Sequence, residues 1–259
     1  MNKLTLWFHK LGSAEYFYRF SGRLIPWLAT ACVIVLAWGL YRGLFVAPPD
    51  YQQGESYRII FIHVPSAWMS LFIYIAMCVS GVVGIVWRIK VAEIVAMASA
   101  PIGAAFTAIT LVTGALWGRP MWGTYWVWDA RLTSELVLLF IYIGIIGLYQ
   151  AIEDRRSAAR AASILALVGL VNIPIIHFSV EWWSTLHQGS TVNLMGDNAI
   201  HPSMLWPLLA MAIATKLFYG FNVLQRARIM LLEQESNRRW AQRILGLEAA
   251  EPSASKSVS

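Results

Sequence analysis

The sequence IIFIHVPSAWMSLFIYIAMCVSGVVGIVW, residues 59–87, runs for 29 residues without a Lys, Arg, Asp or Glu. About 20 apolar residues in a helix cross the roughly 30 Å hydrocarbon core of a bilayer, so this stretch is long enough to span a membrane once. Five further runs of the same kind lie at 24–41, 94–118, 136–152, 161–180 and 198–215. The sequence therefore predicts an all-α, polytopic membrane protein, a bundle of six transmembrane helices.

The composition of the 259-residue chain agrees with this prediction. Hydrophobic residues make up 58% and charged residues only 13% of the chain, and the mean hydropathy is +0.57. Soluble domains carry about 25% charged residues, so a soluble or a disordered chain is excluded. The two cysteines, Cys32 and Cys78, lie singly inside predicted spans, which excludes a Cys-x-x-Cys thiol oxidoreductase and thioether attachment of haem.

The distribution of Lys and Arg predicts the orientation. Six spans place both termini on one side, and that side carries fifteen of the 20 basic residues. Lys216 falls near the last span, and the opposite side carries only Arg42, Arg58, Arg119 and Arg131. Since basic loops stay in the cytoplasm, both termini are expected to be cytoplasmic. The net charge of +6 follows from this bias and does not indicate a nucleic-acid partner.

Three regions are expected along the chain. Residues 1–23 mix aromatic and basic side chains and suit an amphipathic cytoplasmic segment, and 24–225 form the membrane domain. Residues 226–259 are expected to be an amphipathic and then disordered cytoplasmic tail, in which Glu235 and Arg239 are four apart as in a stabilised helix. No nucleotide-binding loop is present, so we expect no enzyme here, and any energy from ATP must come from a partner.

The outer loop at 117–132 is the most unusual segment. It begins WGRPMWGTYWVWD, residues 117–129, and contains four of the 13 tryptophans of the chain. Tryptophan also gathers at membrane interfaces as an aromatic belt, which is the simpler explanation. Belt residues are normally scattered over helix ends, whereas these are concentrated in one loop with two Gly and one Pro. The pattern favours an aromatic platform that binds a ligand.

The run WGTYWVWD, residues 122–129, resembles the tryptophan-rich WGxxWxWD signature of haem-handling membrane proteins of cytochrome c biogenesis. Within that superfamily the chain is most similar to the CcmC family. The similarity spans about 20–225 and includes IHVP at 62–65, NIPIIH at 172–177 and SVEWWSTLHQGS at 179–190. The resemblance implies six spans and a motif loop that faces outward. Tyr125 departs from the family, which often has Trp there, but it preserves an aromatic plane.

Five histidines are candidate iron ligands. His9 is expected in the cytoplasm, His177 at a helix end, and His201 in a cap or turn. His63 and His187 lie in outer segments on either side of the tryptophan loop, and from the residues alone each is only one candidate among several. The resemblance implies that these two are the axial ligands, because histidines at those positions bind haem iron in the family. Metal–nitrogen bonds of about 2 Å would then place their ring nitrogens about 4 Å apart.

The remaining candidate residues would hold the porphyrin and its carboxylates. Guanidinium groups bind carboxylates in a two-pronged way, so Arg58, Arg119 and Arg131 are candidates for the propionates. Alternatively, Arg131 pairs with Glu135 one turn later, and Asp129 caps the helix that follows rather than contacting haem. The expected haem-binding set is His63, His187, Trp117, Trp122, Tyr125, Trp126, Trp128, Asp129, Arg58, Arg119 and Arg131.

The resemblance implies a haem transport protein of the bacterial inner membrane with its site facing the periplasm. Haem b would be held transiently as cargo and passed to the periplasmic haem chaperone CcmE, with help from the small membrane protein CcmD and the ABC transporter subunits CcmA and CcmB. Two other classes stay open. A b-type membrane cytochrome would also use paired histidines for electron transfer. A copper-handling protein would use Met121, Met195, Met204 and the outer histidines.

Overall fold

The computed structural model describes residues 12–189 and 200–247 of the chain, and within them it is helical without a β-strand. Six helical segments are long and apolar enough to cross a membrane, which confirms the predicted fold class. The spans are Ala14–Val46, Glu55–Trp87, Lys90–Trp122, Ala130–Ala151, Arg155–Trp182 and Pro202–Gln234. Each contains all or most of one predicted charge-free run, because such a run can be buried in hydrocarbon without uncompensated charge.

Several helices extend beyond the predicted runs. The first, α2 (Ala14–Tyr41), continues without a break through the predicted boundary at residue 23. Next, α3 (Ile60–Trp87) follows the short 3₁₀ helix η2 (Glu55–Ile59), and α4 (Lys90–Trp122) includes the beginning of the predicted outer loop. The connection between α4 and α5 (Ala130–Ala151) is therefore shorter than the predicted 117–132 loop.

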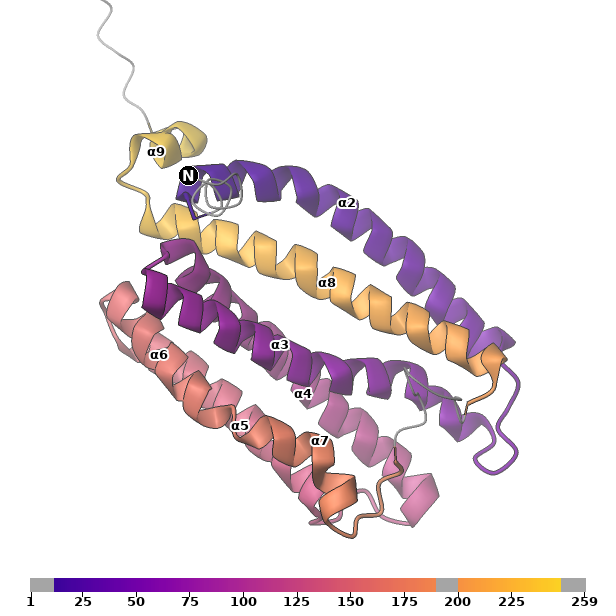
Figure 1. Ribbon diagram of the computed structural model, residues 1–259. Coiled ribbons are helices and arrows are strands. Elements are labelled where there is room, and N and C mark those ends of the chain that lie inside the picture. Colours follow the sequence, from indigo (N-terminus) through magenta and orange to yellow (C-terminus); the bar gives the residue numbers. More distant parts are fainter. Residues whose placement is uncertain (1–11, 190–199, 248–259) are drawn as a thin grey trace, which may run out of the picture.

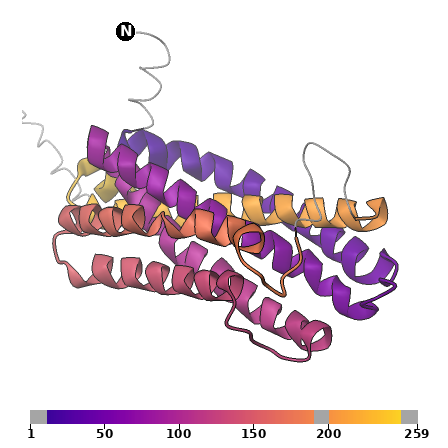
Figure 2. The same ribbon diagram turned by 60° about the horizontal axis from the view of Figure 1, so that its bottom comes forward.

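The fifth span is divided. It consists of α6 (Arg155–Gly169) and α7 (Asn172–Trp182) rather than one helix. Pro174 lacks the N–H group that would bond the carbonyl of Leu170, and Ile173 N donates to that carbonyl instead, at 3.1 Å. Asn172 Nδ2 donates to Ser134 O at 2.9 Å, which ties the break to α5. Figures 1 and 2 show α7 leading on from α6 toward the end of the bundle where α4 ends.

The bundle is arranged around α3 and α4. Figure 1 shows α2 beside α8 (Pro202–Gln234) on one side, α3 and α4 in the middle, and α5 with α6 on the other side. Tyr74 of α3 and Tyr142 of α5 meet edge to face in the core, with ring centroids 5.2 Å apart. Their hydroxyls donate to Ala166 O at 2.7 Å and Ser70 O at 2.9 Å. These buried polar groups are satisfied across helices, as burial requires.

The start of α2 and the short α9 (Arg239–Leu245) lie at the same end of the bundle (Figure 1). This agrees with an even number of spans. The predicted pair of Glu235 with Arg239 is wrong, because α8 ends at Gln234 and Glu235 is its C-cap. Glu235 pairs instead with Lys90 at the start of α4 and with Arg238, at 3.6 Å. The residues 1–11 and 248–259, which include His9 and the segment predicted to be disordered, lie outside the described part.

Candidate functional site

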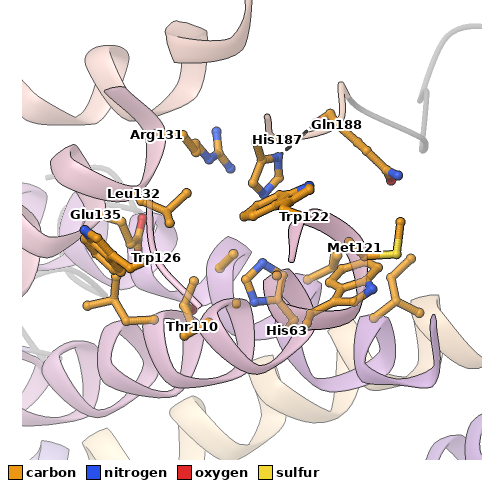
Figure 3. Close-up of a pocket in the computed structure, with 18 of the residues that line it drawn as sticks. His63, Thr110, Met121, Trp122, Trp126, Arg131, Leu132, Glu135, His187 and Gln188 are labelled. Atoms are coloured by element: carbon orange, nitrogen blue, oxygen red, sulfur yellow. Dashed lines mark hydrogen bonds between the residues drawn. The ribbon is translucent and has the colours of Figure 1, made fainter. Parts of the chain in front are cut away.

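A cavity opens at the end of the bundle far from the start of α2 and α9. Its walls come from α3, α4, α5 and the segment that follows α7. It contains about 980 Å³ of space free of protein atoms, part of which is continuous with solvent. Figure 3 shows the side chains that converge on it. Six of the predicted site residues line it: His63, Trp117, Trp122, Trp126, Arg131 and His187.

The two predicted iron ligands face each other across this cavity. His63 lies on α3 and is only 7% exposed, whereas His187 lies in the non-helical segment after α7. Their ring centroids are 6.3 Å apart and their planes differ by 35°. A metal between two imidazoles needs nitrogens about 4 Å apart, and each ring centre lies about 1 Å behind its nitrogen, which gives roughly 6 Å between centres. The observed separation fits two axial ligands on one iron.

Both imidazoles use the Nδ1 atom for a hydrogen bond. His63 Nδ1 is 3.0 Å from Thr113 Oγ1, and His187 Nδ1 is 2.9 Å from the backbone oxygen of Gln188. A carbonyl only accepts, so Nδ1 of His187 carries a proton and Nε2 has a free lone pair. Burial, and then the charge of Arg131, lower the pKa of His187 below its ordinary 6.5. This favours the neutral imidazole, which is the form that binds metal.

Three tryptophans border the histidines. The Trp117 ring lies edge-on to His63 at 5.7 Å between centroids, and its Nε1 donates to Gln53 Oε1 at 2.9 Å. The Trp122 ring centroid is 6.5 Å from that of His187. Trp126 also lines the cavity, and its Nε1 is buried with no hydrogen-bond partner in the described residues. Apolar faces and one unused N–H donor therefore surround the space between the imidazoles.

The other two aromatic residues of the predicted set lie outside the cavity. Tyr125 is 56% exposed and Trp128 is 75% exposed. The chain turns after Trp122 at Gly123, whose φ of +76° suits glycine and ends α4. Trp126 then turns inward, with its ring 5.4 Å from that of Trp128. The loop therefore divides its aromatic side chains between the cavity and the surface.

The three candidate arginines occupy different places relative to the cavity. Arg131 lines the cavity, and its Nη1 donates to Ile176 O at 2.7 Å. Arg58 donates to Gly43 O at 2.8 Å and pairs with Glu55. Arg119 bonds Gly123 O and lies 5.6 Å from the Tyr125 ring centroid. Only Arg131 is thus among the residues that line the cavity.

Asp129 was predicted to cap a helix and Glu135 to pair with Arg131, and the structure bears out only the cap. Asp129 is the N-cap of α5, with Oδ1 accepting from Leu132 N at 2.8 Å, so the predicted cap is confirmed. Its Oδ2 is buried without a partner in the described residues. The predicted pair of Arg131 with Glu135 does not occur among the described ion pairs. Glu135 instead accepts a hydrogen bond from Ser70 Oγ at 2.7 Å.

Of the remaining candidate histidines and methionines, only Met121 is among the described residues that line the cavity. His201 is the N-cap of α8 and accepts from Ser203 N at 3.3 Å, as one alternative predicted. His177 contacts Phe178 on α7. Met121 lines the cavity, while Met204 packs with the cluster around Tyr57, and Met195 lies outside the described residues. Within 12–189 and 200–247, no three His, Cys, Asp or Glu side chains are grouped to hold a bare metal ion.

Comparison with known proteins identifies the family. A family model described as CcmC, heme exporter protein C, matches residues 7–242. The chain belongs to this family. A relative from Escherichia coli strain K12, named heme exporter protein C, is 52% identical over 237 residues, covering 92% of this chain and 96% of the relative. One from Bradyrhizobium diazoefficiens with the same name is 53% identical over 209 residues, or 81% and 79% of the two chains.

The chain is also similar to a protein named as mitochondrial. A putative cytochrome c biosynthesis ccmC-like mitochondrial protein of Marchantia polymorpha is 46% identical over 217 residues, covering 83% of this chain and 92% of the relative. The range matched by the family model, 7–242, includes the six spans and the residues that line the cavity. This match confirms the resemblance that the tryptophan motif indicated.

Sequence reasoning missed part of the cavity of this family member. Glu135 lines the wall and is 5% exposed. A carboxylate one turn inside a span is costly and is a functional signal in its own right, so it could have been found. Thr113 bonds His63 from 50 residues away in the chain, and nothing in the linear sequence relates these two. Gln188 directly follows His187, but the sequence does not show that its carbonyl bonds the imidazole. Only the packing of α4 against α3, and the local turn at His187, brings these pairs together.

Proposed function

We propose that this chain binds haem as cargo between His63 and His187 and takes part in haem export for cytochrome c maturation. The observation that carries the proposal is the 6.3 Å separation of the two imidazole rings inside an aromatic cavity. A porphyrin supplies four equatorial nitrogens, so two protein ligands complete its iron. The names of the relatives, heme exporter protein C, support the same cargo.

The cavity offers groups for the rest of a haem molecule. Trp117, Trp122 and Trp126 present apolar surface to a flat ring. The guanidinium of Arg131 and the unpartnered Nε1 of Trp126 are donors for a propionate carboxylate. We assign Asp129 to holding the loop in place through its helix cap. We assign Tyr125, Trp128, Arg58 and Arg119 to the surface around the cavity rather than to direct haem contact.

The finer features of the proposal come from the family resemblance and the charge distribution. The cargo is haem b, and the cavity faces the periplasm from the inner membrane, within a membrane domain spanning 24–225. The exposed aromatic side chains Tyr125 and Trp128 beside the cavity mouth suit docking of the chaperone CcmE, which takes the haem. CcmD assists, and CcmA with CcmB releases the loaded chaperone by ATP hydrolysis.

The test is the absorption spectrum of the purified protein with haem supplied. His63→Ala and His187→Ala should each abolish or strongly change the six-coordinate haem spectrum. His177→Ala is the matched control, because His177 lies outside the cavity on α7 and should leave the spectrum intact. Unchanged spectra in both cavity variants would refute the ligand pair.

A b-type membrane cytochrome is the competing function, since it also binds haem through paired histidines. Such proteins usually carry electrons across the membrane and need ligands deep in the bundle. The two histidines of the cavity lie in the first turns of α3 and in the segment after α7, rather than deep in the bundle. Rapid reduction of the bound haem by a quinol analogue would favour the cytochrome over haem delivery.

A further inference from the structure

The two imidazoles of the cavity are supported very differently. His63 is buried on α3, and its ring touches side chains of a second helix, α4. The described hydrogen bonds of His187 reach only Thr185 and Gln188, both within two residues of it in the chain. His63 is therefore fixed by a hydrogen bond and ring contact from a second helix, whereas the described hydrogen bonds of His187 come only from its own loop and its contact with α4 is the ring of Trp122.

The hydrogen bond of His63 also defines which ring nitrogen is protonated. Thr113 Oγ1 is 2.6 Å from Ile109 O, which can only accept, so the hydroxyl proton of Thr113 is directed to that carbonyl. The threonine oxygen then offers a lone pair to His63 Nδ1 at 3.0 Å. Nδ1 must carry the proton, and Nε2 has the free lone pair that a metal needs.

Gly114, the next residue of α4, completes the support. A Cβ atom at this position would lie 3.0 Å from His63 Cε1, closer than ordinary van der Waals contact. The imidazole ring is thus held by the Thr113 hydroxyl, the surface of Gly114 and the Trp117 ring. Such outer partners orient a metal-binding histidine and raise its basicity.

We propose that Thr113 is a positioning residue that makes His63 the fixed axial ligand of the haem cargo, and that His187 is the ligand that leaves during transfer. This rests on the proposed function. In the transfer step the iron–Nε2 bond of His187 breaks, and a bond from a nitrogen or oxygen donor of the acceptor protein forms. The oxidation state of the iron does not change, and His63 holds the haem until the acceptor has taken it.

The first experiment tests the role of Thr113. Thr113→Val keeps the side-chain shape but removes the acceptor, and Thr113→Ser restores it. Thr107→Val is the matched control, since Thr107 also lies on α4 and bonds a carbonyl four residues earlier, Gly103 O, but has no described hydrogen bond to His63. Thr113→Val should weaken haem binding about 10- to 100-fold, the usual effect of losing an outer partner. Thr113→Val should also raise the midpoint reduction potential of the bound haem, because a less basic imidazole stabilises ferric iron less.

The same variants can also be compared by NMR in the apoprotein, without haem. In the apoprotein, ¹⁵N shifts of the imidazole should report a proton on Nδ1 of His63 in the wild type, in Thr113→Ser and in Thr107→Val, and a mixture in Thr113→Val. If Thr113→Val had the same imidazole ¹⁵N shifts, haem affinity and midpoint potential as the wild type, the proposed role of Thr113 would be overturned. A Thr113→Ser variant that behaves like Thr113→Val would overturn it as well.

The second experiment tests which ligand leaves. His187→Gly should retain five-coordinate haem on His63, and added imidazole should restore the six-coordinate spectrum. His63→Gly should lose most of its haem, and imidazole should not restore it. Equal haem retention in the two variants, or the reverse order, would overturn the inference while leaving both histidines as ligands. If neither variant alters the spectrum, the proposed function itself fails.

Discussion

At the scale of single residues, the surroundings of His187 favour its neutral imidazole. Burial and the charge of Arg131 both disfavour its cation, so its pKa in the folded protein lies below 6.5. In the folded protein His187 therefore stays neutral to a pH below 6.5, and the stability linked to this group is lost as the pH falls from about 6.5, where the unfolded chain takes up the proton, to the lowered pKa. On the proposed function, the imidazole should therefore be available to iron near neutral pH.

We predict that removing the charge of Arg131 raises the pKa of His187. In apo Arg131→Gln, an NMR titration should show the His187 imidazole titrating at a higher pH than in the wild type. Arg119→Gln is the control, because Arg119 lies away from the cavity beside Tyr125. An unchanged His187 titration in Arg131→Gln would show that Arg131 does not act on this imidazole.

We also predict that substitutions of Arg131 and Arg119 have unequal effects on the affinity for haem. A hydrogen bond to a charged group contributes about 1.5–3 kcal/mol. Arg131→Gln should therefore weaken haem binding at least about tenfold at neutral pH, measured by titration of apoprotein with haem. Arg119→Gln should change it by less than about twofold. Equal effects of the two substitutions would contradict the assignment of Arg131 to a propionate.

At the scale of elements, the start of α5 sets the position of the tryptophan loop. Asp129 ends the loop and caps the helix through Leu132 N. We predict that Asp129→Ala lowers the free energy of unfolding by about 0.5–2 kcal/mol, the usual cost of losing an N-cap. Asp129→Asn keeps an accepting oxygen and should retain most of that stability. Thermal unfolding in detergent measures both, and equal losses would show that the cap is not the stabilising interaction.

At the scale of the whole molecule, the basic turns and the cavity lie at opposite ends of the bundle. The end with the start of α2 and α9 also holds the basic turns around Arg88 and Arg155 (Figure 1). The other end holds the cavity and Arg131. Since basic segments remain in the cytoplasm, the cavity should face the opposite side of the membrane.

We predict that a membrane-impermeant maleimide labels Ser184→Cys in spheroplasts and does not label Asn237→Cys. Both positions are exposed, one near the cavity and one at the basic end. Labelling of the native thiols should be low, because Cys32 and Cys78 are buried. After lysis both variants should react. The reverse pattern in intact spheroplasts would place the cavity on the cytoplasmic side.

The sequence by itself determined the six spans, the α5 cap at Asp129 and the family. A span depends on the transfer of about 20 neighbouring side chains into hydrocarbon, and a cap depends on residues three apart, so both are local properties. The break between α6 and α7 was also locally encoded by Pro174, although the charge-free run alone did not predict it.

The tertiary structure decided which candidate residues form the cavity. Arg58 and Arg131 carry the same group near the same membrane face, yet only Arg131 lines the cavity, because Arg58 is held by Gly43 and Glu55. Thr113 supports His63 only because α4 packs along α3. These contacts join residues distant in the chain, and their formation depends on how whole helices pack rather than on any local pattern.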